Sequence, residues 1–212
     1  MIKKLIKFNN FLFLLKLVSF LNKFISLQEV RTKKEKRVFT KIWYNIWLQE
    51  GYATSKESII EKKRRYENFS RDFLIKFLNF SIGTIRIIHN NNEIGLPITN
   101  NFKLQKNFKN EKIIELSLFS IIRFFRFFHI ISLITMKKIY QLLKKENIPD
   151  FLAAIDQKLL LFLKEKVGIP LHQVGQEKIY EGSLTYPIYL NLKEAEEFGK
   201  QKNYQLYKFF II

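Results

Sequence analysis

The residues of this sequence with the clearest chemical signature are arginines and lysines, gathered in two runs beside aromatic side chains. The first run, RTKKEKRVFTK, occupies residues 31–41, and the second, EKKRR, occupies residues 61–65. Tyr44, Tyr52 and Tyr66 are interleaved with them. Cations neutralise phosphates, and guanidinium groups and rings stack on unpaired bases, so the pattern favours RNA contact, with a solvated basic face as the alternative. The candidate RNA-binding residues in the two runs are Arg31, Lys33, Lys34, Lys36, Arg37, Lys41, Lys62, Lys63, Arg64 and Arg65.

Patterns typical of catalytic or metal sites are not found in the sequence. His89, His129 and His172 have no ligand-type spacing with carboxylates, and the glutamates at 194–197 lie beside lysines as solvated charges do. There is no Gly-rich phosphate loop, nucleophile elbow or carboxylate pair, and the absence of Cys excludes disulfides and thiolate chemistry. We therefore expect a protein that is not an enzyme and that uses no metal, cofactor or small-molecule substrate.

The composition indicates an anionic partner. The chain has 212 residues and a formal net charge of +18, which is typical of proteins that bind phosphate backbones or anionic lipids. Its 22 Phe and its Asn and Lys runs suggest an AT-rich coding genome, and an organelle is the commonest such setting. Residues 2–27 are apolar and basic without an acid, which predicts an amphipathic helix that packs on a partner, with a membrane-surface anchor as the alternative.

The middle of the chain predicts alternating helices and strands. Thr54 and Glu57 form a capping-box pattern, which opens a helix expected to end near Gly83. The elements expected next are a strand over 84–88, an edge strand around Pro97 and a polar loop over 100–112.

A long helix is expected over residues 112–146. It contains the stretch SLFSIIRFFRFFHIISLIT, residues 117–135, in which a polar residue stands at every third position. On a helix these residues wind once around the axis, which indicates burial by several partners rather than one wet face. Spaced arginines also resemble a voltage-sensing span, but no stretch of about 20 residues in the chain is free of charge. We expect Arg123 and Arg126 to reach RNA or a partner carboxylate.

The C-terminal part indicates further mixed structure. Residues 149–168 fit either one helix or two short strands around Asp156 and Gln157, and periodicity does not decide between them. The tail predicts a strand over 186–190, a short helix opened by Asn191, and a final strand over 204–212. Helices and strands without a βαβ rhythm predict an α+β fold.

Four collinear segments resemble the family of the eighth protein of the small ribosomal subunit. They are Asp72-Phe-Leu-Ile-Lys-Phe-Leu-Asn79 leading to Gly83, Ile139-Tyr-Gln-Leu-Leu-Lys-Lys-Glu146 leading to Ile148, the pair Pro149–Phe151 and Lys158–Lys164, and Tyr186–Glu194. The resemblance implies a strand hairpin over 149–166. It also implies binding to the central domain of small-subunit ribosomal RNA, with Arg71, Lys76 and Asn79 as family-position contacts.

The resemblance divides the chain into three parts. We expect a basic helical extension over 1–70, an α+β domain over 71–168 with an insertion at about 84–131, and a truncated or divergent α+β domain over 169–212. Ser132 is followed by Leu133 where the family has Ser-Lys, and the family's C-terminal Ser-Thr-Ser-Gly loop is missing. A separate chain is one candidate source of that missing part.

The expected function is therefore a structural constituent of the mitochondrial small ribosomal subunit, located in the matrix and encoded in the organelle. Its partners are small-subunit ribosomal RNA and neighbouring ribosomal proteins. Two alternatives stand beside it: a peripheral or membrane-associated subunit of a respiratory-chain or ATP synthase complex, and a stand-alone nucleic-acid-binding or maturase-like factor.

Overall fold

The computed structural model describes most of the chain, namely residues 18, 20–52, 60, 64–91, 93–108, 112–126 and 129–211. Three sequence-based predictions fall on other positions. The capping box at Thr54 and Glu57, the candidate contacts Lys62 and Lys63, and most of the helix expected over 2–27 lie outside the described residues.

One eight-stranded sheet organises the described residues, in the order β1-β2-β3-β4-β5-β8-β6, with β7 also paired to β8. All pairs are antiparallel except β4 with β5, which is parallel. The strands are β1 (Ile25–Glu29), β2 (Ser70–Phe77), β3 (Phe80–His89), β4 (Ile114–Ile121), β5 (Asp150–Asp156), β6 (His172–Gln173), β7 (Lys178–Tyr180) and β8 (Ser183–Asn191).

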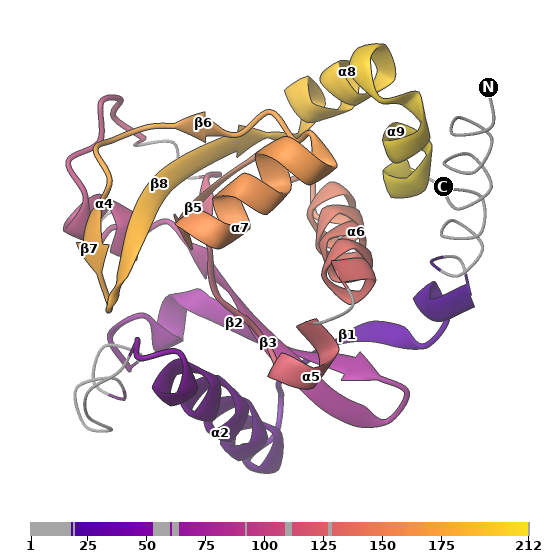
Figure 1. Ribbon diagram of the computed structural model, residues 1–212. Helices are drawn as coiled ribbons and strands as arrows, with labels where there is room; N and C mark the ends of the chain where they lie inside the picture. Colours follow the sequence, from indigo (N-terminus) through magenta and orange to yellow (C-terminus); the bar gives the residue numbers. More distant parts are fainter. Residues whose placement is uncertain are drawn as a thin grey trace.

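Helices cover both faces of this sheet (Figure 1). On one face α2 packs against β2, β3 and β4, and α4 packs against β5. The other face carries α6, α7 and the π-helix η2, whose apolar side chains share a core with β5 and β8. The helices are α2 (Lys33–Gln49), η1 (Glu67–Phe69), α4 (Pro97–Asn101), α5 (Arg123–Arg126), α6 (His129–Lys145), α7 (Gln157–Leu161), η2 (Phe162–Val167), α8 (Leu192–Lys202) and α9 (Tyr204–Ile211).

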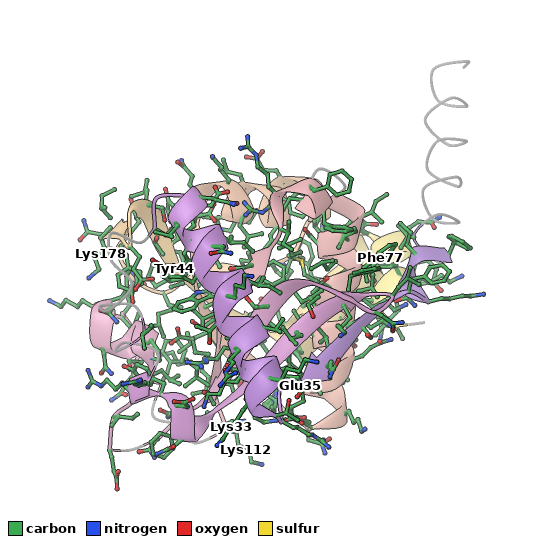
Figure 2. The ribbon with its side chains drawn as sticks, turned by 90° about the horizontal axis from the view of Figure 1, so that it is seen from below. Lys33, Glu35, Tyr44, Phe77, Lys112 and Lys178 are labelled. Atoms are coloured by element: carbon green, nitrogen blue, oxygen red, sulfur yellow. The ribbon has the colours of Figure 1, made fainter. Side chains whose placement is uncertain are left out.

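The basic run that leads into Trp43 folds as helix α2. Thr32 caps it: its side chain accepts from the backbone N–H of Glu35, and the Glu35 carboxylate accepts from the backbone N–H of Thr32 at 2.9 Å. Phe39, Trp43 and Ile46 form the buried face. The lysines therefore point outward, and Figure 2 shows Lys33 and Glu35 near one end of this helix on the surface.

The helix expected from Thr54 to Gly83 is wrong, because residues 70–77 and 80–89 form the strands β2 and β3. The apolar spacing of Phe73, Phe77 and Phe80 fits a helix, but Leu74 and Ile75 are buried as well. Helices on both faces of the sheet bury both faces of these strands, so they read as continuous apolar runs without alternation. The strand expected over 84–88 is confirmed within β3.

The long helix expected over 112–146 is also wrong in its first half. Residues 114–121 form β4, a short α5 follows, and the helix α6 begins only at His129. Ser120 of β4 pairs with Thr84 of β3, and Ser117 pairs with Arg86. The two β4 residues are three positions apart, whereas their β3 partners are only two positions apart. The extra residue is a β-bulge, at which Leu118 has φ 53°. The bulge places polar residues of this strand three positions apart, a spacing that in the sequence resembles that of a helix.

The other corrections concern Pro97 and the C-terminal half. Pro97 opens the helix α4 instead of an edge strand. The hairpin implied over 149–166 is half right, since β5 is a strand but Asp156 then caps the helix α7 through the N–H of Leu159. The final strand over 204–212 is a helix, α9, which places Phe210 against Tyr140 of α6.

The predicted α+β class is confirmed, as are strand β8 and the Asn191 cap of α8, whose side chain accepts from the N–H of Glu194 at 2.8 Å. A two-domain ribosomal body is not supported, because one sheet joins β1, from the expected extension, to β8, from the expected last domain. The boundaries at 70/71 and 168/169 stay predictions.

Candidate functional site: a cavity in the gap between two parallel strands

The parallel strands β4 and β5 separate soon after they meet. Their register contains only the pairs Ile114 with Phe151 and Glu115 with Leu152, although β4 continues to Ile121 and β5 to Asp156. A cavity of about 750 Å³ occupies the diverging region and is lined by residues 116–121 of β4 and 153–156 of β5. Its volume is in the range of small-molecule binding sites.

The cavity is lined from both faces of the sheet. Alternate β5 residues point to opposite sides: Ala153 belongs to the core beneath α6 and α7, and Ala154 packs with the core beside α4. The half beneath α6 and α7 is largely apolar, with lining residues that include Met136, Tyr140, Leu159, Phe162, Leu163 and Phe210. The half beside α2 carries polar groups, among them Trp43, Glu50, Tyr52, Glu115, Arg126 and Asp156.

Glu115 is the buried carboxyl group of this cavity. It lies on β4 at the last pair before the strands separate, and it is 3% exposed. Its Oε2 accepts the backbone N–H of Ile98 at 2.7 Å, and α4 supplies this donor. Burial raises the pKa of Glu115 from 4.5 to about 8, against the lowering effect of that hydrogen bond, and the charge of Glu181 adds to the rise. A carboxyl group with this pKa exchanges a proton near neutral pH.

Four polar side chains of the cavity lining interact near the end of α2: Arg126, Glu50, Tyr52 and Asp156. Arg126 of α5 donates from Nη1 to Oε1 of Glu50 at 2.8 Å and from Nε to the carbonyl oxygen of Ile121. Burial raises the pKa of Tyr52, with further increases from the charges of Asp156 and Glu50 and a decrease from Arg126. These groups are therefore close enough to interact electrostatically.

The end of α2 is held in place by a backbone contact with the turn between β7 and β8. Gly182 in that turn has φ +80°, and a Cβ atom there would meet the carbonyl oxygen of Gly51. Only glycine fits this conformation and this approach without strain. The contact joins the end of α2 to the β7–β8 turn, and the neighbouring residues Tyr52 and Glu181 line the cavity.

Most of the predicted RNA contacts lie away from the cavity. Those on α2 and just before it form an exposed outer face: Arg31, Lys33, Lys34, Lys36, Arg37 and Lys41. Two of them pair within the chain, Lys36 with Glu67 and Arg31 with Glu29 at 3.3 Å. Whether this face binds RNA stays a prediction.

The remaining candidates are scattered. Arg71 is held by Glu29 at 2.7 Å and by Glu146 at 2.5 Å, so its charge is used inside the chain. Lys76 is half-buried on β2, Asn79 is exposed in the turn between β2 and β3, and Arg64 and Arg123 are exposed. Of the candidates in the part of the chain that the structure describes, only Arg65 and Arg126 line the cavity. Arg126 does reach a carboxylate, but that of Glu50 in its own chain.

Sequence reasoning missed Glu115, Asp156 and the small residues Ala153 and Ala154. A signal for Glu115 was present, since it is the single acid in the apolar run IIELSLFSII over residues 113–122. An acid inside a strand of this kind indicates a buried carboxyl group, but a helical interpretation of the run places it on a surface turn.

Comparison with known proteins gives structural matches only. No protein-family model matches the sequence, and no curated protein matches it either. Among solved structures, the N-acyl amino acid synthase FeeM from uncultured soil microbes is 17% identical, covers 82% of this chain and 93% of its own, and has a TM-score of 0.61.

Two further structures match in the same way. Spermidine N-acetyltransferase from Vibrio cholerae, solved with CoA and spermine, is 10% identical, covers 82% of this chain and 98% of its own, and has a TM-score of 0.55. An acetyltransferase of the GNAT family from Staphylococcus aureus Mu50 is 14% identical, covers 79% of this chain and 99% of its own, and has a TM-score of 0.52. The chain shares a GNAT-like fold with these structures.

This fold overturns the ribosomal interpretation. The neighbours are acyltransferases rather than ribosomal proteins, so the resemblance to the eighth small-subunit protein is wrong, and so are the ribosomal function and the ribosomal RNA partner inferred from it. The alternative of a respiratory-chain or ATP synthase subunit is not supported either. The expectations of no catalysis and no small-molecule substrate are contradicted, since these neighbours are enzymes and one was solved with CoA and spermine. The mitochondrial location is untested and stays a prediction.

Among the described residues, no helix has both the length and the apolar character needed to cross a membrane.

Proposed function

We propose that the protein is an N-acyltransferase that moves an acyl group from a coenzyme A thioester to an amine. The observation that carries the proposal is the cavity between β4 and β5, which is lined from both faces of the sheet and holds a buried carboxyl group. Two substrates that enter from opposite faces meet in this gap, which supplies the proximity that direct transfer requires. The GNAT fold supports the same reaction class by analogy.

The thioester donor is assigned to the half of the cavity beneath α6 and α7. Beyond Glu115 the edge of β4 that faces β5 is not paired with it, so backbone groups there can bind the two amides of an extended pantetheine arm. The first turn of α6, which follows β4, supplies backbone N–H groups for the diphosphate, with the exposed Arg123 nearby in sequence. The apolar lining suits the acyl chain.

The amine is assigned to the polar half beside α2, where Glu115 acts as general base. Glu115 takes a proton from the ammonium group, and the free nitrogen attacks the thioester carbonyl carbon. A C–N bond forms, the C–S bond breaks, and the sulfur takes the proton that the attacking nitrogen loses, so coenzyme A leaves as a thiol. Amines are mostly protonated at neutral pH, so a base of this kind increases the reactive fraction at the site.

Incubation of the purified protein with acyl-CoA and amines tests this function. Release of free thiol above the uncatalysed rate is expected when donors from acetyl-CoA to dodecanoyl-CoA are combined with amino acids and polyamines. Mass spectrometry of the products should show the matching amides. If no donor yields thiol and calorimetry detects no binding of any acyl-CoA, the proposal is wrong.

Two neighbouring alanines separate the roles of the two faces. Ala153→Leu adds volume to the half beneath α6 and α7 and is expected to raise the KM for the donor, whereas Ala154→Leu adds it on the other face and is expected to raise the KM for the amine. Each effect should be about 5- to 150-fold, from an overpacking cost of about 1–3 kcal/mol at the occupied site. Steady-state kinetics with each substrate varied in turn measures both.

Serine at the same positions provides matched controls, since it adds little volume. Equal effects of the two leucine variants on both substrates would contradict the assignment of one substrate to each face. Circular dichroism and thermal melts identify any variant whose loss comes from unfolding.

A further inference from the structure

Arg126 is fixed in place with one part of its guanidinium group unused. Nε donates to the carbonyl oxygen of Ile121 and Nη1 donates to Glu50. Nη2 is buried and has no hydrogen-bond partner among the described residues. A buried donor without a partner costs about 1–3 kcal/mol, and more when it is charged. A ligand with a hydrogen-bond acceptor at Nη2 would remove this cost, so Nη2 is a binding group for such a ligand.

A second unused donor lines the same cavity. Trp43 of α2 is 2% exposed, and its Nε1 has no partner within the described part of the chain. Trp43 and Arg126 both line the cavity, so it has two unused donors. A tryptophan N–H only donates, and a guanidinium group only donates. The missing ligand must therefore carry hydrogen-bond acceptors.

The charges around Arg126 define the ligand further. Glu50 already forms an ion pair with Arg126, and Asp156 lines the cavity and interacts electrostatically with Tyr52. A polyanion such as the diphosphate of coenzyme A would meet the repulsion of these two carboxylates. A polyamine would leave Nη2 and the indole N–H without acceptors. A zwitterion satisfies both signs, because its carboxylate binds the arginine and its ammonium group is attracted by Asp156.

We propose that the acceptor amine is an amino acid, whose carboxylate accepts a hydrogen bond from Nη2 of Arg126 while its amino group lies toward the gap between β4 and β5. This inference rests on the proposed acyltransferase function and names its acceptor. Arg126 binds and orients the amino acid. The carboxylate of the amino acid is unchanged by the reaction. Trp43 donates to a second oxygen, such as one on the amino acid side chain.

Matched acceptors test the proposal. Each amino acid is compared with its methyl ester, which keeps the amine and the side chain but lacks the charge, and spermidine serves as the cationic probe. The free acids are expected to have a kcat/KM about 10- to 100-fold higher than that of the esters, the range for a hydrogen bond to a charged group. Arg126→Gln is expected to bring this ratio close to one, mainly through KM, and Arg126→Lys to give an intermediate ratio.

Arg31→Gln is the control, since Arg31 is exposed and is not part of the cavity lining, and it should keep the wild-type ratio. Calorimetric titration with the preferred free amino acid should show binding to the wild type and its loss in Arg126→Gln, while thermal melts check that the variant is folded. Acylation of esters or spermidine as efficient as that of the acids overturns the inference and leaves the acyltransferase function standing. Absence of acylation with every acceptor overturns both.

Discussion

Replacing Glu115 with Gln is expected to slow acyl transfer by about 10²- to 10⁴-fold, the contribution of a positioned general base. The amide keeps an oxygen that can accept the N–H of Ile98, so the local hydrogen bond survives while the base is lost. Steady-state kinetics with a saturating donor and a varied amine measures the loss. The exposed Glu93 lies outside the cavity lining, and Glu93→Gln is the matched control.

The pH profile distinguishes this role from a structural one. Only the carboxylate form of Glu115 accepts a proton, and its pKa is about 8, so the wild-type kcat/KM is expected to rise with pH and to level off above about 8. Glu115→Gln should lose this step and retain only the rise that comes from deprotonation of the free amine at higher pH. An unchanged profile in the variant would show that another group is the base.

Stability provides an independent check on the same carboxyl group. The pKa of Glu115 is raised on folding, so the folded chain holds this proton more tightly than the unfolded chain, and a destabilising contribution grows as the pH rises from about 4.5 to about 8. Glu115→Gln removes that contribution. Its melting temperature should therefore exceed that of the wild type at pH 9 but not at pH 4. A lower melting temperature at both values would mean that Glu115 has a different protonation behaviour.

Loss of the carboxylate at position 72 is expected to have the largest effect on stability. Arg86 donates from Nε to Oδ1 of Asp72 at 2.6 Å and from Nη2 to Oδ2 at 2.9 Å. The side chains are 2% and 10% exposed, and Arg86 also lies 6.0 Å from the ring of Phe39 beneath α2. Asp72→Asn removes the carboxylate that forms both of these hydrogen bonds with the buried guanidinium group, and a loss of about 3–5 kcal/mol in the free energy of unfolding is expected from urea denaturation.

A double replacement provides the control for this ion pair. Asp72→Leu combined with Arg86→Met removes both charges, and apolar side chains of similar volume often restore the stability of a broken buried pair. We expect the double variant to be more stable than Asp72→Asn. If it is less stable, the cost arises from packing around the two strands rather than from an uncompensated charge.

The parts of the fold that the sequence predicts correctly are those defined by local chemistry. The Asn191 cap of α8 depends on one side chain and a backbone N–H three residues later, and the strand over 84–88 depends on β-branched residues. The C-terminal half of the expected long helix is α6. In each case the residues that decide the structure lie within a few positions of one another.

The errors arise where burial or a bulge changes the expected period. Strands β2 and β3 are buried on both faces, so they lack the alternation that identifies a half-exposed strand. The bulge at Leu118 sets Ser117 and Ser120 three residues apart on one strand, where a regular strand would set them two apart. The misread segment Asp72–Gly83, which forms β2 and the start of β3, was one of the four short segments on which the ribosomal resemblance rested.

The candidate site was not predictable for a related reason. Burial and the charge of Glu181 in the β7–β8 turn raise the pKa of Glu115, and the hydrogen bond from the N–H of Ile98 on α4 opposes this rise. Arg126 is oriented by Glu50, which is 76 residues away along the chain. No local pattern indicates that these groups line one cavity.

The sequence by itself determined the α+β class, the large positive charge, the absence of cysteine thiols and the helix that follows β8, which is capped by Asn191. Only the tertiary structure decided that β4 and β5 separate after two paired positions, and that a buried carboxyl group and a fixed guanidinium group line the resulting cavity. The physical reason is that caps and strand propensities act between neighbouring residues. Burial, pKa and the pairing of distant strands depend instead on which remote segments displace water around a group.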